Sequence, residues 1–223
     1  MQNIPLWNPS EAYIESSELR KFHSYVSEKG HCAATATYHE LWQWSVTHID
    51  DFWRCVAEYF QLKFHSPYQQ VIKEIPNSLI GTKWFEGATL SYAEHIFRNE
   101  TAENPAIIFQ DETQPYTEIT WSDLRRKVTA IQQYLQKLGV KKGDRVAGYL
   151  TNSADTVAIF LAANSIGAVW SCCSPDFGTD SVVERFQQIE PKVFFATATY
   201  SYNGKVFDKS ETIKAIADKL PSL

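Results

Sequence analysis

The chain has 223 residues, of which 44% are hydrophobic and 21% are charged, and its formal net charge at pH 7 is −5. This composition excludes a disordered or collagen-like chain, and the negative charge argues against general nucleic-acid binding, which needs a basic face. Glycine and proline number nine each, so the sequence predicts a folded globular protein.

No segment of the sequence has the pattern of a targeting signal or a membrane span. Residues 1–5 lack the basic and apolar parts of a secretory signal, and the longest apolar stretch, residues 157–173, is interrupted by polar residues and a glycine. The four cysteines form no C-x-x-C pair. We therefore expect a cytoplasmic protein with no membrane partner.

Residues 1–99 are predicted to form a helical, aromatic-rich region, which holds all six histidines of the chain. One helix is predicted over residues 15–28, before Gly30. Thr37 and Glu40 have the spacing of a capping box at the start of a second helix. Its apolar face recurs at steps of three and four residues through Leu41, Ser45, Ile49, Phe52, Val56 and Phe60. Residues 66–89 read as an extended crossing segment.

Residues 100–223 alternate between strand and helix, which predicts crossover units and a parallel sheet. The expected strands cover residues 106–109, 117–120, 144–150, 168–172 and 192–196. The expected helices cover residues 120–139, 154–166 and 180–189, and a last helix is capped by Ser210. The fold class is therefore α/β, with a helical N-terminal region followed by a largely parallel sheet that is flanked by helices.

Three loops follow the carboxyl ends of the predicted parallel strands, at residues 151–153, 174–179 and 199–205. Ligands of open parallel sheets bind at this edge, so we expect the loops to share one rim. The second loop leads into a helix N-terminus, which favours an anion, and the third ends in a turn that presents Lys205. A phosphate site is one interpretation. In the other, Asp176 and Thr179 cap their helix and the turn is solvated.

Common catalytic motifs are absent from the sequence. It contains no phosphate-binding G-x-x-x-x-G-K-[ST] or G-x-G-x-x-G motif and no G-x-S-x-G nucleophile motif, and residues 100–223 contain no histidine. The spacing of the histidines and cysteines matches no zinc pattern. A Ser-His-Asp triad within residues 100–223 is therefore excluded, and we predict no metal ligand in this chain.

Several segments resemble the acetyl-CoA-synthetase-like family of adenylate-forming enzymes. Residues 84–88 (WFEGA) and 90–94 (LSYAE) resemble the start of the family's catalytic domain, and residues 143–149 (GDRVAGY) resemble its first core strand. Residues 166–178 (IGAVWSCCSPDFG), with 185–192 and 200–205, are similar to the branch of the family that activates acetoacetate. The resemblance covers essentially the whole chain and implies the first part of an adenylate-forming N-terminal domain.

The resemblance also implies a reaction in two steps. A carboxylate attacks the α-phosphate of ATP to give an acyl-adenylate and pyrophosphate, and the thiol of CoA then displaces AMP. The implied substrates are acetoacetate, ATP with Mg²⁺, and CoA. In the family, the phosphate loop, the adenine-binding segments and a mobile domain with a catalytic lysine lie further along the chain. We therefore expect an N-terminal fragment that is inactive alone, binds no cofactor tightly and has the rest of its own chain as a partner.

By resemblance, two segments contribute to the CoA surface. The loop of Asp176, Phe177 and Gly178 corresponds to the region near the pantetheine tunnel, and Arg185 is a further candidate. Lys205 matches a basic position that faces CoA phosphates, whereas Tyr202 stands where acetyl-CoA synthetases have an arginine.

Two alternatives stay open at the level of sequence. One is a related short-chain acyl-CoA synthetase for acetate or propionate, because the family builds its acid pocket mostly from later segments. The other is a non-catalytic α/β binding module.

Overall fold

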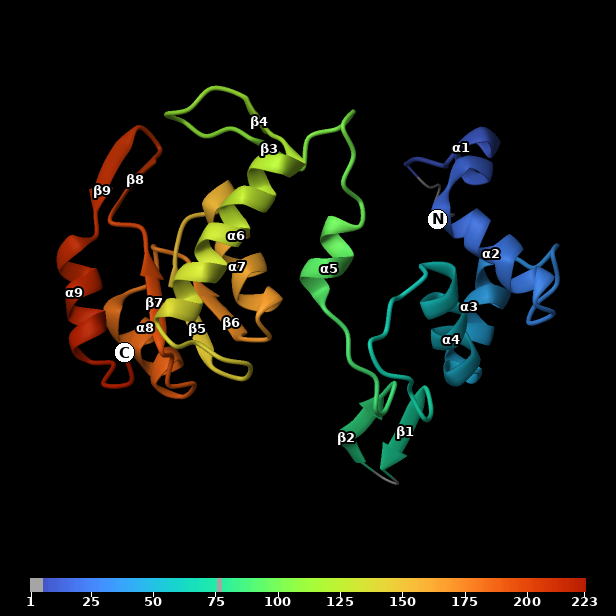
Figure 1. Ribbon diagram of the computed structural model, residues 1–223. Coiled ribbons are helices and arrows are strands. Elements are labelled where there is room, and N and C mark those ends of the chain that lie inside the picture. The colour runs from blue at the N-terminus through green and yellow to red at the C-terminus, as the bar shows by residue number, and fades with distance from the viewer. Residues whose placement is uncertain (1–5, 76–77) are drawn as a thin grey trace, which may run out of the picture. The chain divides into compact units, whose positions relative to one another are not determined.

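A computed structural model describes residues 6–75 and 78–223 and divides the chain into two compact units, residues 1–90 and 91–223 (Figure 1). Residues 1–5, where the sequence shows no secretory signal, lie outside the described part. The boundary at residue 99, inferred from composition, stays a prediction. No helix in the described ranges has the length and apolar character needed to cross a membrane.

Four helices open the N-terminal unit: α1 (Glu11–Ser16), α2 (Glu18–Glu28), α3 (Tyr38–Thr47) and α4 (Ile49–Tyr59). The capping box is confirmed, because the Thr37 hydroxyl accepts a hydrogen bond from the Glu40 amide while the Glu40 carboxylate accepts one from the Thr37 amide. Both bonds satisfy amides that would otherwise lack a partner at the start of α3.

Each of the two helices predicted in this unit is interrupted, so both predictions of a continuous helix are wrong. Ser17 is extended and separates α1 from α2, because its hydroxyl donates to the Ile14 carbonyl and accepts from the Arg20 amide. His48 (φ −124°, ψ 56°) likewise separates α3 from α4. The preceding Thr47 is β-branched, and its hydroxyl donates to the Gln43 carbonyl at 2.8 Å, a contact that bends helices.

The predicted extended segment is a hairpin. Strands β1 (Ile72–Ile75) and β2 (Ser78–Trp84) pair antiparallel, with Ile72 opposite Trp84. The Glu86 carboxylate lies 3.1 Å from the ammonium groups of Lys73 and Lys83, whose hydrogen bonds lower its pKa. These contacts join the end of the hairpin to both of its strands.

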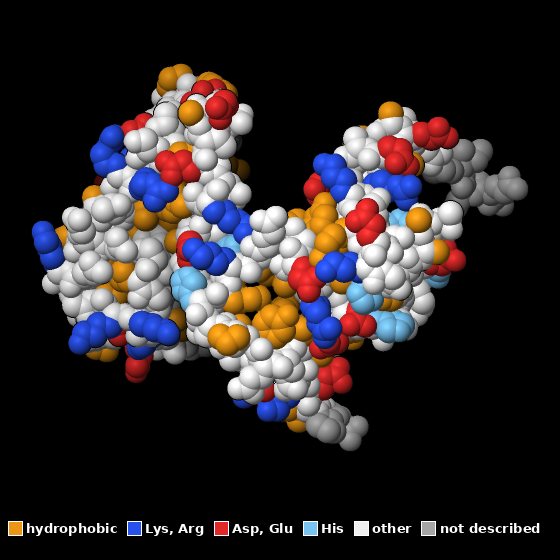
Figure 2. Space-filling model, turned by 45° about the vertical axis from the view of Figure 1, so that its right-hand side comes forward, with side chains coloured by type: hydrophobic (Ala, Val, Ile, Leu, Met, Phe, Trp, Pro, Cys, Tyr) orange, Lys and Arg blue, Asp and Glu red, His pale blue; other side chains and the backbone are white. Residues whose placement is uncertain are grey.

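The aromatic residues of the N-terminal unit divide between core and surface. Phe22, Val26, Leu41, Trp44 and Cys55 form its buried cluster. Figure 2 shows hydrophobic side chains at the molecular surface, and in this unit the exposed ones include Leu19, Trp42 and Phe60. These three line an apolar groove of about 370 Å³ formed by α2, α3 and α4.

The second unit alternates strands and helices as predicted. Its helices are α5 (Tyr92–Phe97), α6 (Trp121–Lys137), α7 (Ala154–Ser165), α8 (Thr179–Gln187) and α9 (Ser210–Asp218). Its strands are β3 (Ile107–Phe109), β4 (Thr117–Ile119), β5 (Arg145–Tyr149), β6 (Val169–Cys173), β7 (Val193–Ala196), β8 (Thr199–Tyr202) and β9 (Lys205–Asp208). The α/β class is confirmed.

A three-stranded parallel sheet forms the centre of this unit, in the order β6-β5-β7. Helices α6 and α7 contribute to the core on one face, which includes Val146 of β5. Helices α8 and α9 contribute to the core on the other face, which includes Ala147 and Tyr149. Side chains alternate along a strand, so β5 is buried on both faces.

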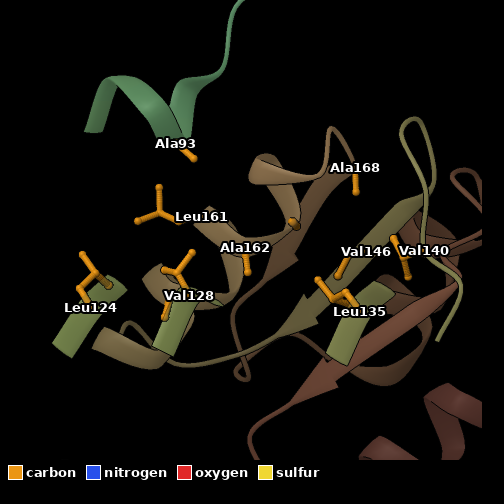
Figure 3. Packing of buried hydrophobic residues seen from close by; sticks show 11 residues of the cluster. Ala93, Leu124, Val128, Leu135, Val140, Val146, Leu161, Ala162 and Ala168 are labelled. Carbon is orange, nitrogen blue, oxygen red and sulfur yellow. The ribbon is translucent and has the colours of Figure 1, made fainter. Parts of the chain in front are cut away.

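The apolar residues of α6 are buried in the core that this helix forms with α5, α7 and the sheet. Leu124, Val128 and Leu135 point from α6 toward Leu161, Ala162 and Val146 (Figure 3). The apolar spacing of the sequence also assigns Leu138 to this buried stripe. That assignment is wrong, because Leu138 follows the last residue of α6 and is 44% exposed. The buried stripe of α6 ends at Leu135.

The cap predicted for the last helix is wrong by one residue. Ser210 is the first residue of α9, and the N-cap is Lys209, whose side chain makes no capping hydrogen bond. The Asp208 carboxylate instead accepts a hydrogen bond from the Ser210 amide at 2.8 Å.

Leu135 and Leu138 provide a matched pair for testing this core. Leu135→Ala removes a fully buried side chain and is expected to lower the free energy of unfolding by about 2–5 kcal/mol. Leu138→Ala, next to the same helix but exposed, is expected to change it by about 0.5 kcal/mol or less. Urea denaturation followed by circular dichroism measures both, and equal losses would contradict the packing described.

Candidate functional site

A cavity of about 630 Å³ lies at the carboxyl edge of the parallel sheet. Residues 151–153, 174–176 and 199–202 line it, so the expectation that three loops share one rim is confirmed. A fourth segment, residues 109–111 with Thr113 and Gln114, also lines it. This β3–β4 loop was missed, since nothing local in its sequence places it beside the sheet edge.

Tyr149, the last residue of the central strand, holds the second loop in place. Its ring is fully buried, and its hydroxyl lies 2.6 Å from the Pro175 carbonyl oxygen and 2.8 Å from that of Phe177. Burial raises the pKa of the Tyr149 hydroxyl, so the group stays protonated and shares its single hydrogen between these two carbonyls. The loop conformation therefore depends on a residue of the core.

Asp176 projects from this loop with an exposed carboxylate that lines the cavity. Its pKa is lowered, first by a hydrogen bond from the Ser174 side chain, then by its own backbone amide and by the Lys209 charge. The interpretation that Asp176 caps the following helix is wrong: the N-cap of α8 is Gly178, and no side chain bonds there. Its ionised carboxylate thus remains available as an acceptor in the cavity.

Phe177 and Arg185 come together beside the same loop. The Arg185 guanidinium carbon lies 5.0 Å from the centre of the Phe177 ring, a cation–π contact, and its Nη1 donates to the Ser181 carbonyl at 3.0 Å. Phe177 is nevertheless 41% exposed. Arg185 therefore braces an aromatic ring that still presents a surface to solvent.

The third loop, which the sequence predicts only as a turn, is a hairpin. Strands β8 and β9 pair antiparallel with Tyr202 opposite Lys205, and the two turn residues, Asn203 (φ 51°) and Gly204 (φ 68°), are both left-handed. An Asn-Gly pair between short strands is a strong hairpin signal. Tyr202 is 67% exposed, and Lys205 makes no ion pair with any residue in the described ranges.

Glu112 of the β3–β4 loop contacts this turn. The Asn203 amide donates to its Oε1 at 2.7 Å, and the Gly204 amide donates to its Oε2 at 2.9 Å. These residues are 91 and 92 positions apart in the sequence, so no local pattern could identify the contact. We refer to it below as the Glu112–turn contact.

The predicted ligand residues thus fall into two groups. Asp176 and Tyr202 line the cavity itself. Phe177 and Gly178 lie where the second loop enters α8, Arg185 reaches Phe177 from the last turn of this helix, and Lys205 begins β9. Across residues 6–75 and 78–223, no three His, Cys, Asp or Glu side chains are grouped so that they could hold a metal ion.

Comparison with known families gives matches along most of the chain. Residues 95–223 match the family described as AMP-binding enzyme, and residues 38–96 match the family described as acetyl-coenzyme A synthetase N-terminus.

Individual relatives agree with these matches. Acetoacetyl-CoA synthetases of Macaca fascicularis and Rhizobium meliloti are 34% and 35% identical over 98% and 97% of this chain. A malonamoyl-CoA synthetase of Penicillium aethiopicum is 33% identical over 98% of it. The solved acetoacetyl-CoA synthetase of Streptomyces lividans superposes with a TM-score of 0.93 at 40% identity, over 99% of this chain and 34% of that one. The chain spans about a third of the length of the curated relatives it matches.

Tyr149→Phe tests the role of the buried hydroxyl. The ring stays in place, but two loop carbonyls lose their donor, so the free energy of unfolding should fall by about 1–2 kcal/mol. Amide hydrogen exchange in residues 174–180 should become faster. Tyr200→Phe is the matched control, because the Tyr200 ring stacks on Phe207 and its hydroxyl makes no hydrogen bond to any residue that the structure describes. Unchanged exchange in Tyr149→Phe would show that the loop does not depend on this hydroxyl.

Proposed function

The chain belongs to the AMP-binding enzyme family, and from this membership we propose that it is the N-terminal part of an ATP-dependent ligase that joins acetoacetate to CoA. The observation that carries the proposal is the similarity to acetoacetyl-CoA synthetases along nearly the whole chain, with a TM-score of 0.93 to one of them. The products are acetoacetyl-CoA, AMP and pyrophosphate.

The proposed chemistry has two balanced steps. A carboxylate oxygen of the acid attacks the α-phosphorus of ATP and pyrophosphate leaves, and the sulfur of CoA then attacks the acyl carbon and AMP leaves. Both steps need fixed positive groups and Mg²⁺ near the phosphates. We assign no catalytic residue and no magnesium ligand to this chain, and we propose that it acts in the cytoplasm and is inactive without the remainder of the enzyme.

The cavity at the carboxyl edge supports a role in holding CoA. Asp176 places a carboxylate on the cavity lining. The exposed ring of Phe177 follows it directly in the chain, and Lys205, which carries an ammonium group, lies opposite Tyr202, which also lines the cavity. Pantetheine carries two amide N–H groups, which can donate hydrogen bonds to a carboxylate such as that of Asp176. Its apolar arm can pack against an aromatic ring such as that of Phe177. Lys205, with Tyr202 beside it, is suited to the phosphate end of CoA, and Gly178 and Arg185 support the loop between them.

The names of the relatives support a proposal for the acid. The acetoacetyl and malonamoyl groups after which they are named both have a second carbonyl beyond the carbon next to the thioester. We therefore propose a short acid with a carbonyl at this position, and acetoacetate before malonamate because the acetoacetyl-CoA synthetases include the more similar proteins.

Turnover by the natural protein that carries this chain tests the function. With ATP, Mg²⁺ and CoA, acetoacetate should release pyrophosphate and form a thioester faster than malonamate, acetate or propionate do. Faster turnover of acetate or propionate would show that one of these, and not acetoacetate, is the substrate. Binding of an acid or of CoA without any turnover would favour a non-catalytic binding module.

Lys205→Glu tests the CoA assignment. Reversing this charge should raise the KM for CoA about tenfold, because a charge-assisted contact to phosphate is replaced by repulsion. Acetoacetate-dependent exchange of pyrophosphate into ATP should change by less than about twofold, since adenylate formation precedes CoA binding. Lys214→Glu, an exposed lysine of α9 without an ion pair in the described ranges, is the matched control. An unchanged KM for CoA would remove Lys205 from the site.

A further inference from the structure

The Glu112–turn contact places a carboxylate on the part of the hairpin that we assign to CoA phosphate. Two adjacent backbone amides, those of Asn203 and Gly204, each donate one hydrogen bond to a separate oxygen of Glu112. The turn therefore binds an anion in this structure, and the anion is a side chain of the same chain.

The geometry of the turn suits a phosphate as well as a carboxylate. Both residues are left-handed, and their N–H groups are directed at the two oxygens of one carboxylate. Such convergent amides form anion-binding sites in proteins. Lys205 follows directly in the sequence and makes no ion pair in the described part of the chain, so a cationic group adjoins these donors.

Glu112 and a phosphate oxygen cannot accept from the same two hydrogen atoms at once. Each amide carries a single hydrogen, and both are directed at Glu112. A phosphate that approached beside the carboxylate would also meet a like charge. We propose, on the basis of the function proposed above, that Glu112 competes with a phosphate group of CoA for the turn and is displaced when CoA binds.

The surrounding loop keeps Glu112 in position without depending on this contact. The neighbouring Asp111 accepts hydrogen bonds from the amides of Thr113 and Gln114, both at 2.7 Å, which fixes the loop conformation. Residues of the same loop and of β8 line the cavity. The contact therefore joins the two segments when the turn carries no phosphate, and its displacement separates them.

Glu112→Gln in the natural protein tests the competition. The substitution keeps the size of the side chain and removes its charge, so kcat/KM for CoA should rise about threefold to tenfold. The kcat/KM for pantetheine, which has the thiol arm but no phosphate, should stay unchanged. Glu118→Gln is the matched control: it lies on the same β3–β4 hairpin, and its carboxylate accepts from Tyr116 and not from the turn. An unchanged or lower value for CoA, or an equal rise for pantetheine, would overturn the proposal.

A second measurement does not depend on turnover. Amide hydrogen exchange at residues 203–204 should be faster in Glu112→Gln, and inorganic pyrophosphate should slow it more in this variant than in the unsubstituted protein. Equal effects of pyrophosphate on both proteins would overturn the competition. Absence of thioester formation by the natural protein would instead reject the proposed ligase function, while the exchange result would still decide the role of Glu112.

Discussion

The parallel pairing of β5 with β6 on one side and β7 on the other is the constraint on which the second unit depends. Close packing at β5 permits little variation. A Cβ atom on Gly148 would lie 2.8 Å from the Trp170 ring and 2.9 Å from the Leu150 side chain, both nearer than normal contacts allow. Since parallel strands end at the same edge, this pairing brings the loops at residues 151–153, 174–176 and 199–202 to one cavity.

Tyr149 connects the hydrophobic core around α8 to the loop that lines the cavity. Its ring packs with Phe186 and Val182 of α8, while its hydroxyl bonds to the loop that precedes this helix. The position of Asp176 and Phe177 is therefore set by burial of an aromatic ring rather than by the loop sequence alone. The 174–178 loop is thus tied to the core, whereas Lys205 and Glu112 lie at the β8–β9 hairpin and are not held by a core residue in this way.

Local signals in the sequence predict much of this structure. The capping box at Thr37 and the apolar stripe of α6 are satisfied within a few residues, so they appear in the fold as expected. The breaks at Ser17 and His48 were missed because periodicity continues through a residue that leaves the helix. The Glu112–turn contact depends on tertiary structure that brings together residues 91 and 92 positions apart, and no local pattern contains that information.

We propose that CoA binds at the carboxyl edge of the parallel sheet. Amide hydrogen exchange of the natural protein, measured with and without CoA, tests this proposal. Residues 151–153, 174–178 and 199–205 are expected to exchange more slowly when CoA is present, whereas the exchange rates of the residues that line the apolar groove of α2, α3 and α4 are expected to stay the same. Slower exchange at other segments, with these three loops unchanged, would show that CoA binds elsewhere.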